Sequence, residues 1–463
     1  MDIQTITYLT MGLFILALTL FFFKNDELLL LIVLFFYSSG INRYNVVVNG
    51  REKWVVVAYS KNIFNLTNEL AIQALNYYFW GVFTMCIAYF TFKINYKRVL
   101  KFQDNKSYLV SYLDKNKVLI IISFILVGFV NFYSKRGFAD AYRSGDASIA
   151  FGNSYSIMIG FAFGGFIVLV YLIYSNLDLR KAGASKIFFL AIFVYAASRT
   201  YSSAGRFQFL SWAVAVGVIM VKDTSPVLKL RTYIIGGFFL SIAFGLAGAM
   251  RGKNSSEFTF RERIDMAMSR NTSGEDQTML DGFMMVLQVY PQHLNYHYGG
   301  EHLEVLFRPI PRSLWPGKPL GGYANKLGLN DNMGGGSVGI SQSLFGSFYG
   351  EGGILGIFIF SIIYSSLLFI IFRYGDRYDS DVRWIIKGIT ISSFIPLLRG
   401  GDLPGVYAFI GMTFWPTVFF IYRYNKFLIT AKRNLMQQYM REQQLQMNAA
   451  ELMKKNEIAT PVN

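Results

Sequence analysis

Cysteine is almost absent from this chain of 463 residues, since Cys86 is its only thiol. One cysteine cannot form a disulfide within the chain, and it cannot build a cysteine-ligated metal centre. Histidine is nearly as scarce, and its 3 residues all lie between positions 293 and 302. These counts exclude a disulfide-stapled scaffold and a zinc-finger fold.

Charged residues are also scarce. They make up 16% of the chain, and hydrophobic residues make up 53%, whereas soluble domains contain about 25% charged residues. This deficit and many long apolar runs place the chain among membrane proteins. Its net charge of +16 indicates basic cytoplasmic loops and anionic lipids or substrates as partners. No basic–aromatic module typical of nucleic-acid binding is present, so we expect no nucleic-acid partner.

Eleven apolar segments approach or reach the length of about 20 residues that a membrane-spanning helix needs. They are 5–23, 27–42, 70–92, 117–134, 156–175, 186–199, 206–221, 231–250, 352–373, 384–398 and 405–423. The first lacks the basic start and cleavage site of a signal peptide, so we expect it to be retained. The shorter segments indicate helices that are tilted, broken or re-entrant, and broken spans point to a functional site. The sequence predicts an all-α, polytopic membrane protein with about 11 transmembrane helices.

Lysine and arginine between the spans set the predicted orientation, because cytoplasmic loops are enriched in them. Basic residues gather in 93–117, in 176–186 and in the C-terminal segment 424–463. With eleven spans, all three segments lie on one side, which we predict to be cytoplasmic. The segment 43–70 then lies outside despite its basic residues. Within the tail, the composition of 431–455 predicts either a helix near the cytoplasmic membrane surface or a solvated extension.

The segment 251–351 is about 100 residues long, well beyond ordinary connections, which indicates a functional loop. The odd number of spans, eleven, places this segment on the outer side. It contains short helical patterns at about 258–270 and 277–290. The predicted organisation is therefore spans one to eight in 1–250, a large periplasmic loop in 251–351, spans nine to eleven in 352–423 and a cytoplasmic tail in 424–463.

Arginine recurs at the outer ends of the predicted helices, where the positive-inside bias depletes it. The four residues are Arg199, Arg206, Arg251 and Arg399, and Tyr201 lies in the turn between the first two. Guanidinium groups bind phosphate oxygens in pairs, and the glycines beside three of these arginines allow close approach of a ligand. The set predicts an anion-binding site. Snorkelling to lipid headgroups is the alternative for each arginine alone.

Acid–base candidates lie on the same predicted side. Asp402, in a turn after Arg399, is a candidate general base, with turn capping as the alternative. His293 and His297 share the spacing of one helix face, so a zinc site, a hydrogen-bonding or base residue and an ordinary loop are all open. Glu351 is a further base candidate, again with capping as the alternative.

A proline-rich segment, 308–319, enforces extended or turn backbone in the loop. Trp315 is suited to stacking on a sugar or anchoring at the interface, and Arg312 and Lys318 are suited to phosphate or acidic sugar. A rigid loop with a tryptophan anchor is the alternative. The glycine-rich stretch 334–353 lacks the strand and Lys-Ser/Thr of a nucleotide P-loop. We predict it to be a flexible rim.

The segment 311–319 reads PRSLWPGKP and resembles the Pro-x-x-Leu-Trp-Pro-x-Lys/Arg-Pro stretch in the periplasmic loop of Wzy-type O-antigen and enterobacterial-common-antigen polymerases. Gly205-Arg206 is similar to the Gly-x-Arg segment of that family, without the intervening residue. The order of 345–347, 398–399 and Asp402 also follows the family. The resemblance covers roughly 200–405, and the first half matches only in hydropathy.

The resemblance implies a repeat-unit polymerase of the bacterial inner membrane, with a GT-C-like fold and an active site facing the periplasm. Its donor is a glycan on undecaprenyl diphosphate, and its acceptor is a repeat unit on a second such lipid. An acceptor hydroxyl attacks the anomeric carbon and the lipid diphosphate leaves. A flippase and a chain-length regulator are the implied protein partners, beside membrane lipids.

The residues proposed for the diphosphates are Arg199, Arg206, Arg251 and Arg399, with Asp402 or a histidine as base. No Asp-x-Asp signature stands on the predicted outer face, so we expect a metal-independent reaction without a cofactor. The nearest alternative is O-antigen ligase, which transfers the glycan to lipid A core of lipopolysaccharide. Two further alternatives are a lipid-linked oligosaccharide flippase, for which no internal repeat is seen, and a non-catalytic scaffold.

Overall fold

The computed structural model describes the backbone of residues 1–55, 64–95, 101–102, 104–144, 159–177, 183–200, 206–249, 278–307, 322–327 and 340–458, with positions 259, 261–262, 265, 310, 314–315 and 317. Within these ranges the chain is helical and forms no β-strand. Seven segments of the described chain are long and apolar enough to cross a membrane: Ile3–Lys24, Leu28–Val48, Asn68–Ile94, Ile159–Asn176, Pro226–Ala243, Ser343–Gly375 and part of Leu403–Ala450. The predicted all-α membrane class is confirmed.

Each predicted apolar segment is helical over most of its described part. The helices are α1 (Ile3–Lys24), α2 (Leu28–Phe36) with η1 (Tyr37–Asn42) and α3 (Arg43–Val48), α4 (Asn68–Ile94), α5 (Lys106–Ser144), α7 (Phe163–Asn176), α8 (Gly183–Thr200), α9 (Arg206–Met220), α10 (Pro226–Ala249), α15 (Ser343–Gly375), α16 (Val382–Arg399) and α17 (Leu403–Ile458). Those in α5, α8, α9 and α16 are not among the seven candidate spans. The number eleven therefore stays a prediction.

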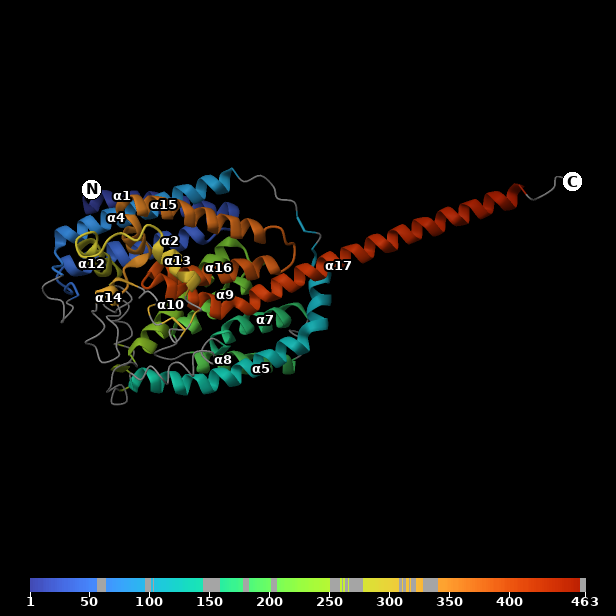
Figure 1. The fold of residues 1–463 in the computed structure, drawn as a ribbon, viewed down its shortest axis with the longest axis horizontal. Helices are drawn as coiled ribbons and strands as arrows, with labels where there is room; N and C mark the ends of the chain where they lie inside the picture. Colours follow the sequence, from blue (N-terminus) through green and yellow to red (C-terminus); the bar gives the residue numbers. More distant parts are fainter. Residues whose placement is uncertain are drawn as a thin grey trace.

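The helices lie side by side in a bundle with two buried apolar cores (Figure 1). The first core gathers around α4 and α15, which pack against each other and against α1, α2 and the loop helix α12 (Met279–Val289). The second gathers around α7 and α9, with α5 and α17. Helix α16 contributes Phe394 to the first core and Ile385 to the second, so it joins the two halves.

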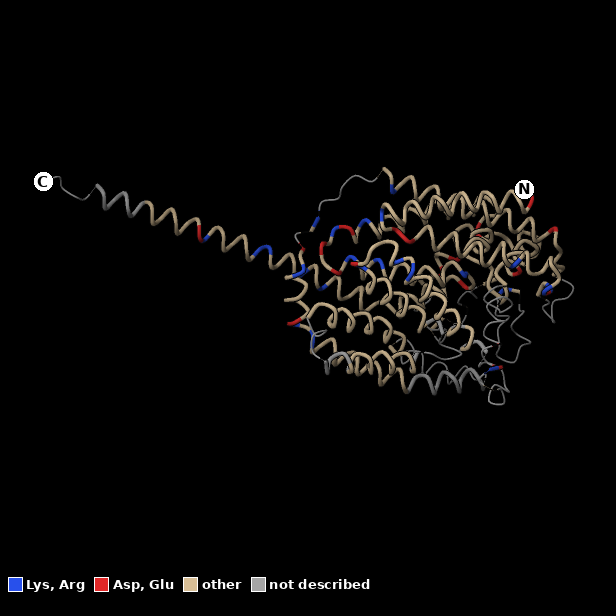
Figure 2. Tube along the Cα trace, turned by 180° about the vertical axis from the view of Figure 1, so that it is seen from behind, with Lys and Arg blue, Asp and Glu red and all other residues tan. Residues whose placement is uncertain are grey.

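The two ends of the bundle differ in charge. Many lysines and arginines gather at the end from which α17 leaves the body (Figure 2). They stand at the ends of spans and in the turns between them, and include Lys24, Lys93, Lys101, Lys222, Lys229, Arg377, Arg383 and Lys387. By the positive-inside bias, this end is expected to face the cytoplasm. The N-terminus and α12 lie at the other end (Figure 1).

Helix α17 continues from the bundle into a long projecting rod (Figure 1). Its side chains from Asn434 to Ala450 are exposed in the structure. The predicted tail helix over 431–455 is therefore a direct continuation of the last apolar segment, and no turn separates the two.

The long segment 251–351, predicted to lie outside and called the loop below, enters the bundle through α12, which is buried along almost its whole length. Its Asp281 accepts two hydrogen bonds from Arg43 of α3, at 2.8 Å from Nε and 2.9 Å from Nη2. Both side chains are buried, and Asp281 also accepts from the amide of Val55 at 2.9 Å. A buried charge is tolerated only when it is paired and hydrogen-bonded. This pair therefore holds the loop against the second apolar segment, and it accounts for one basic residue on the predicted outer side.

Candidate functional site

Helix α15 is interrupted where it meets the loop. Gly353 has φ 62° and ψ −144°, and Gly352 before it has ψ 33°, so the backbone leaves the helical conformation there. The positive φ at Gly353 suits glycine, which has no Cβ. The predicted flexible rim over 334–353 is wrong for residues 343–351, because they form a helix with buried apolar side chains, among them Phe345 and Phe348. Residues 334–339 lie outside the described residues.

The interruption is bridged by the loop. A break in a helix leaves carbonyl groups without their usual amide partners, and buried backbone groups must find others. The amide of His297 donates to the carbonyl oxygen of Gly350 at 3.1 Å, and that of Tyr298 donates to Glu351 at 2.7 Å. The amide of Gly299 donates to the Glu351 carboxylate at 2.6 Å. Three consecutive amides thus fix the loop on the end of α15.

A chain of acid–base side chains begins at Glu351. Its carboxylate is fully buried and lies 2.6 Å from Nδ1 of His302, whose side chain is 21% exposed. Nε2 of His302 lies 3.0 Å from the hydroxyl of Tyr364, which is hydrogen-bonded to the hydroxyl of Tyr407. Phe360 stacks on the imidazole, with ring centroids 4.4 Å apart and planes 6° apart. The imidazole is therefore held in one orientation, with one nitrogen toward a carboxylate and the other toward a phenol.

A second cluster lies beside this chain. Nε2 of His297 lies 2.8 Å from the hydroxyl of Tyr290 and 3.1 Å from Nζ of Lys326. Lys326 also lies 3.7 Å from Glu301 and 3.6 Å from Glu304. Burial raises the pKa of Glu301 to about 8, although Lys326 opposes this. Burial and Lys326 together lower the pKa of His297 to about 4. At neutral pH the cluster thus holds a neutral histidine and a protonated carboxyl, each of which can both donate and accept hydrogen bonds.

Asp402 borders the second cluster. It stands just before α17, and its charge is among those that raise the pKa of Glu301. A Cβ built on Gly322, at the start of the turn that carries Lys326, would lie 3.7 Å from Cβ of Asp402. Asp402, His297 and Glu351, predicted separately as acid–base candidates, therefore gather in one region.

The other predicted residues are placed less fully. Arg399 is the last residue of α16 and is partly buried. Trp315 is 36% exposed, with its ring edge-on to Phe307 at 5.6 Å. His293 is exposed on the turn after α12. The side chains of Arg199 and Arg206 lie outside the described residues, as do the whole of Tyr201, Arg251, Arg312 and Lys318.

The sequence reasoning missed most of the acid–base chain. His302 was grouped with the other two histidines, and neither Tyr364 nor Tyr407 was singled out. Tyr364 follows Glu351 by 13 residues and Tyr407 is in another helix, so no local spacing connects them. The usable signal was that Glu351 adjoins Gly352-Gly353 at the mouth of an apolar span, because ionisable groups at such positions are often functional.

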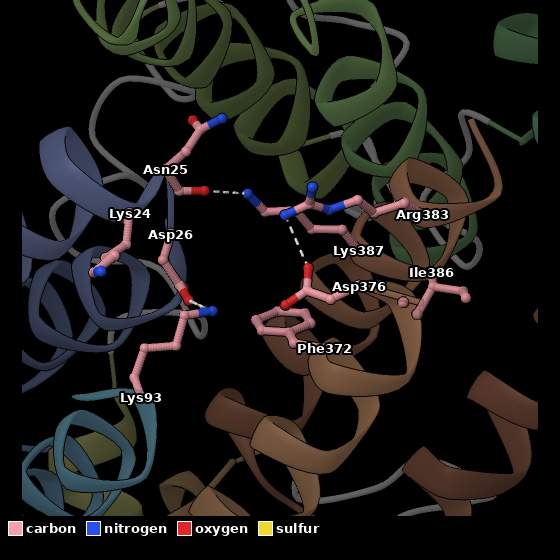
Figure 3. Close-up of a pocket in the computed structure, with 10 residues that line it drawn as sticks. Lys24, Asn25, Asp26, Lys93, Phe372, Asp376, Arg383, Ile386 and Lys387 are labelled. Atoms are coloured by element: carbon pink, nitrogen blue, oxygen red, sulfur yellow. Dashed lines mark hydrogen bonds and ion pairs between the residues drawn. The ribbon is translucent and has the colours of Figure 1, made fainter. Parts of the chain in front are cut away.

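Another polar cavity lies at the basic end of the bundle (Figure 3). Its volume is about 30 Å³, enough for one or two water molecules. Lys93 lies 2.9 Å from Asp26, and Arg383 lies 2.8 Å from Asp376. Lys387 donates to the carbonyl oxygen of Asn25 at 2.5 Å. The size and the ion pairs indicate a structural cluster that joins the ends of α1, α4, α15 and α16.

No group of three or more His, Cys, Asp or Glu side chains suited to a metal ion is found among the described residues. Comparison of the chain with protein-family models, with curated proteins and with solved structures finds no match.

Proposed function

We propose that this protein is a membrane glycosyltransferase that polymerises oligosaccharide repeat units carried on undecaprenyl diphosphate. The observation that carries the proposal is the chain from Glu351 through His302 and Tyr364 to Tyr407, set where the loop meets the membrane-spanning helices. The same loop contains the 311–319 motif that resembles the polymerase family. The proposed setting is the periplasmic face of a bacterial inner membrane.

The proposed chemistry needs a base that accepts the proton of the attacking hydroxyl. With Nδ1 of His302 protonated toward Glu351, Nε2 is free to accept the hydroxyl proton of Tyr364. The acceptor sugar hydroxyl gives its proton to Tyr407, Tyr407 gives its own to Tyr364, and Tyr364 gives its own to His302. The resulting imidazolium is stabilised by the buried carboxylate of Glu351. The oxygen of the acceptor sugar bonds to the anomeric carbon of the donor, and the bond between that carbon and the lipid diphosphate breaks.

The leaving diphosphate also needs a partner. Its developing charge is stabilised by preorganised donors, for which guanidinium groups are suited. Arg399 at the end of α16 is our candidate in the described part of the chain, together with Arg199, Arg206 and Arg251 from the sequence. The loop cluster of His297, Glu301 and Lys326 is suited to the hydroxyls of the glycan, since it offers both donors and acceptors at neutral pH.

The test is to reconstitute the purified protein in vesicles and to supply repeat units on undecaprenyl diphosphate. The proposal predicts a ladder of lipid-linked products that differ by one repeat unit, with release of undecaprenyl diphosphate. Glu69→Gln is the matched control, because Glu69 is an exposed carboxylate in the first turn of α4. It should give the wild-type ladder.

A second arm adds lipid A core as a competing acceptor. Polymerase activity leaves the core unmodified, whereas a ligase transfers one glycan to each core and makes no ladder. Absence of both products, with substrate moved across the vesicle membrane instead, would favour the flippase alternative.

A further inference from the structure

A groove on the side of the bundle lies outside the proposed active site. It runs between α5, α7 and α17 and has a volume of about 380 Å³, within the range of about 300–1,000 Å³ typical of ligand sites. Its buried lining includes Ile120, Phe166 and Leu169. Leu119 and Phe419, on its rim, are 65% and 55% exposed. Such exposure on a membrane-spanning bundle means that the groove opens toward lipid.

The groove is polar at one end. Arg423 of α17 lies beside Tyr112 of α5, and Asn116 stands one turn further along α5. The next residue of α17, Tyr424, is hydrogen-bonded to Asp104, which also accepts from the amide of Ser380 at 2.9 Å. Asp104 precedes α5 and Ser380 precedes α16, so the polar end lies at the level of the inter-helix turns at the basic end of the bundle.

The length of the groove matches one leaflet. Tyr112 and Ser123, which line it on α5, are eleven residues apart, or about 16 Å at the helical rise. This is roughly half of the ~30 Å hydrocarbon thickness of a bilayer. An apolar channel of that length, with a cation at the headgroup end, fits one lipid molecule of the leaflet at the basic end of the bundle.

We propose that this groove binds an anionic glycerophospholipid, with its phosphate at Arg423 and an acyl chain along Phe166 and Leu169. The charge of Arg423 favours an anionic headgroup, because its guanidinium forms paired hydrogen bonds to phosphate. The direction of the groove argues against the lipid-linked glycan as its occupant. That lipid would place its diphosphate at the opposite end of the bundle, near the break in α15.

The experiment is native mass spectrometry of the full chain, delipidated in mild detergent and titrated with phosphatidylglycerol or phosphatidylcholine. We expect one phosphatidylglycerol to be retained in preference to phosphatidylcholine. Arg423→Ala should weaken phosphatidylglycerol binding about fivefold, the contribution of one basic residue to anionic-lipid attraction. Its effect on phosphatidylcholine should be small. Ser123→Trp, which fills the groove, should weaken both.

Lys426→Ala is the control, since Lys426 is the next basic residue on α17 and packs over Tyr422 outside the groove. It should bind phosphatidylglycerol like the wild type. Equal binding by Arg423→Ala and Lys426→Ala would overturn the proposal, and so would equal affinity for the two phospholipids. Undecaprenyl phosphate is titrated in a third arm, and tighter binding of it than of phosphatidylglycerol would assign the groove to the substrate lipid instead. Each outcome is independent of the polymerase assay.

Discussion

At the residue scale, the proposed chemistry depends on whether Glu351 and His302 move protons or only hold the loop in place. The carboxylate of Glu351 makes bonds of both kinds: it accepts from the amide of Gly299, and it lies 2.6 Å from the imidazole of His302. Loss of the first would loosen the loop, whereas loss of the second would remove the partner of the base. A rate measured with substrate saturating separates the two, because a loosened loop chiefly raises KM.

The buried pair of Arg43 and Asp281 gives a prediction about stability. Removing one partner of a buried ion pair leaves an uncompensated charge and costs about 3–5 kcal/mol. Arg43→Met should therefore lower the apparent unfolding temperature in detergent and reduce the amount of folded protein. The double variant Arg43→Met with Asp281→Leu should recover part of the loss, because the fully buried carboxylate is then removed together with its cation, and the carboxylate that still loses a partner, Glu52, is partly exposed. A double variant as unstable as Arg43→Met would contradict the assigned pairing.

The pH dependence of stability gives a second prediction. The pKa of Glu301 is raised to about 8 in the fold, so the native state keeps a proton that the unfolded chain has lost, and stability falls as pH rises toward 8. The pKa of His297 is lowered to about 4, so its contribution is lost as pH falls from about 6.5 to 4. Below about pH 6.5, His297 and Glu301 change the stability in opposite directions as pH rises. Above that pH, of these two groups only Glu301 still changes it.

The unfolding temperature should therefore fall on the order of 1–3 °C between pH 6.5 and 8. Glu301→Gln should flatten this decline, since the amide does not ionise. Glu442→Gln on the projecting part of α17 is the control and should keep the wild-type slope, because Glu442 is exposed. The same slope in Glu301→Gln as in the wild type would mean that the carboxyl is already ionised at neutral pH.

Single residues were the hardest to predict from the sequence. Local spacing singled out Glu351, His297 and Asp402 as candidates, because each stands at a visible boundary such as a glycine pair or a turn. It did not find that Glu351 faces His302 from 49 residues away, or that Lys326 is placed against His297. Such pairings depend on how the loop folds back on the spans, and no local pattern encodes them.

At the scale of elements, the turn between α16 and α17 sets the position of Arg399 and Asp402. Gly400 has φ +72°, and a Cβ at this position would lie 2.2 Å from the carbonyl oxygen of Ser343. Glycine is thus required both by the backbone conformation and by the contact with the start of α15. This contact brings the beginning of α17 to the first residue of α15.

Gly400→Ala should consequently destabilise the protein by about 2–5 kcal/mol, from left-handed strain and overpacking together. Gly236→Ala is the matched control, because Gly236 lies within α10 and its added Cβ would meet nothing within 4 Å. That variant should be as stable as the wild type or slightly more stable. Thermal unfolding of the two purified variants checks the difference, and equal stabilities would contradict the close contact.

Elements were predicted better than residues. Hydropathy located the helices, because a long apolar run in lipid must satisfy its backbone hydrogen bonds internally. It also located α12 within 277–290. The prediction for 343–351 was wrong, because the glycines there indicated a flexible rim. The buried side chains of Phe345 and Phe348 stabilise a helix despite these glycines. The predicted helix over 258–270 lies almost wholly outside the described residues.

At the scale of the whole molecule, the two ends of the bundle carry different chemistry. One end is rich in lysines and arginines, several of which are paired with carboxylates such as Asp26 and Asp376 (Figures 2 and 3). The other holds the loop helices, the interrupted α15 and the acid–base chain. The proposed function requires this separation, because the charge of one end would orient the protein and the other end would hold the reacting groups.

The most direct measurement is the polymerisation rate of Glu351→Gln in reconstituted vesicles, with lipid-linked repeat units saturating. If His302 is the base, kcat should fall by about 10²–10⁴-fold, with KM and protein stability close to those of the wild type. Glu351→Asp should recover part of the rate, and the Glu69→Gln control should be unaffected. A Glu351→Gln protein that folds normally and extends glycans at the wild-type rate would contradict the proposed proton relay.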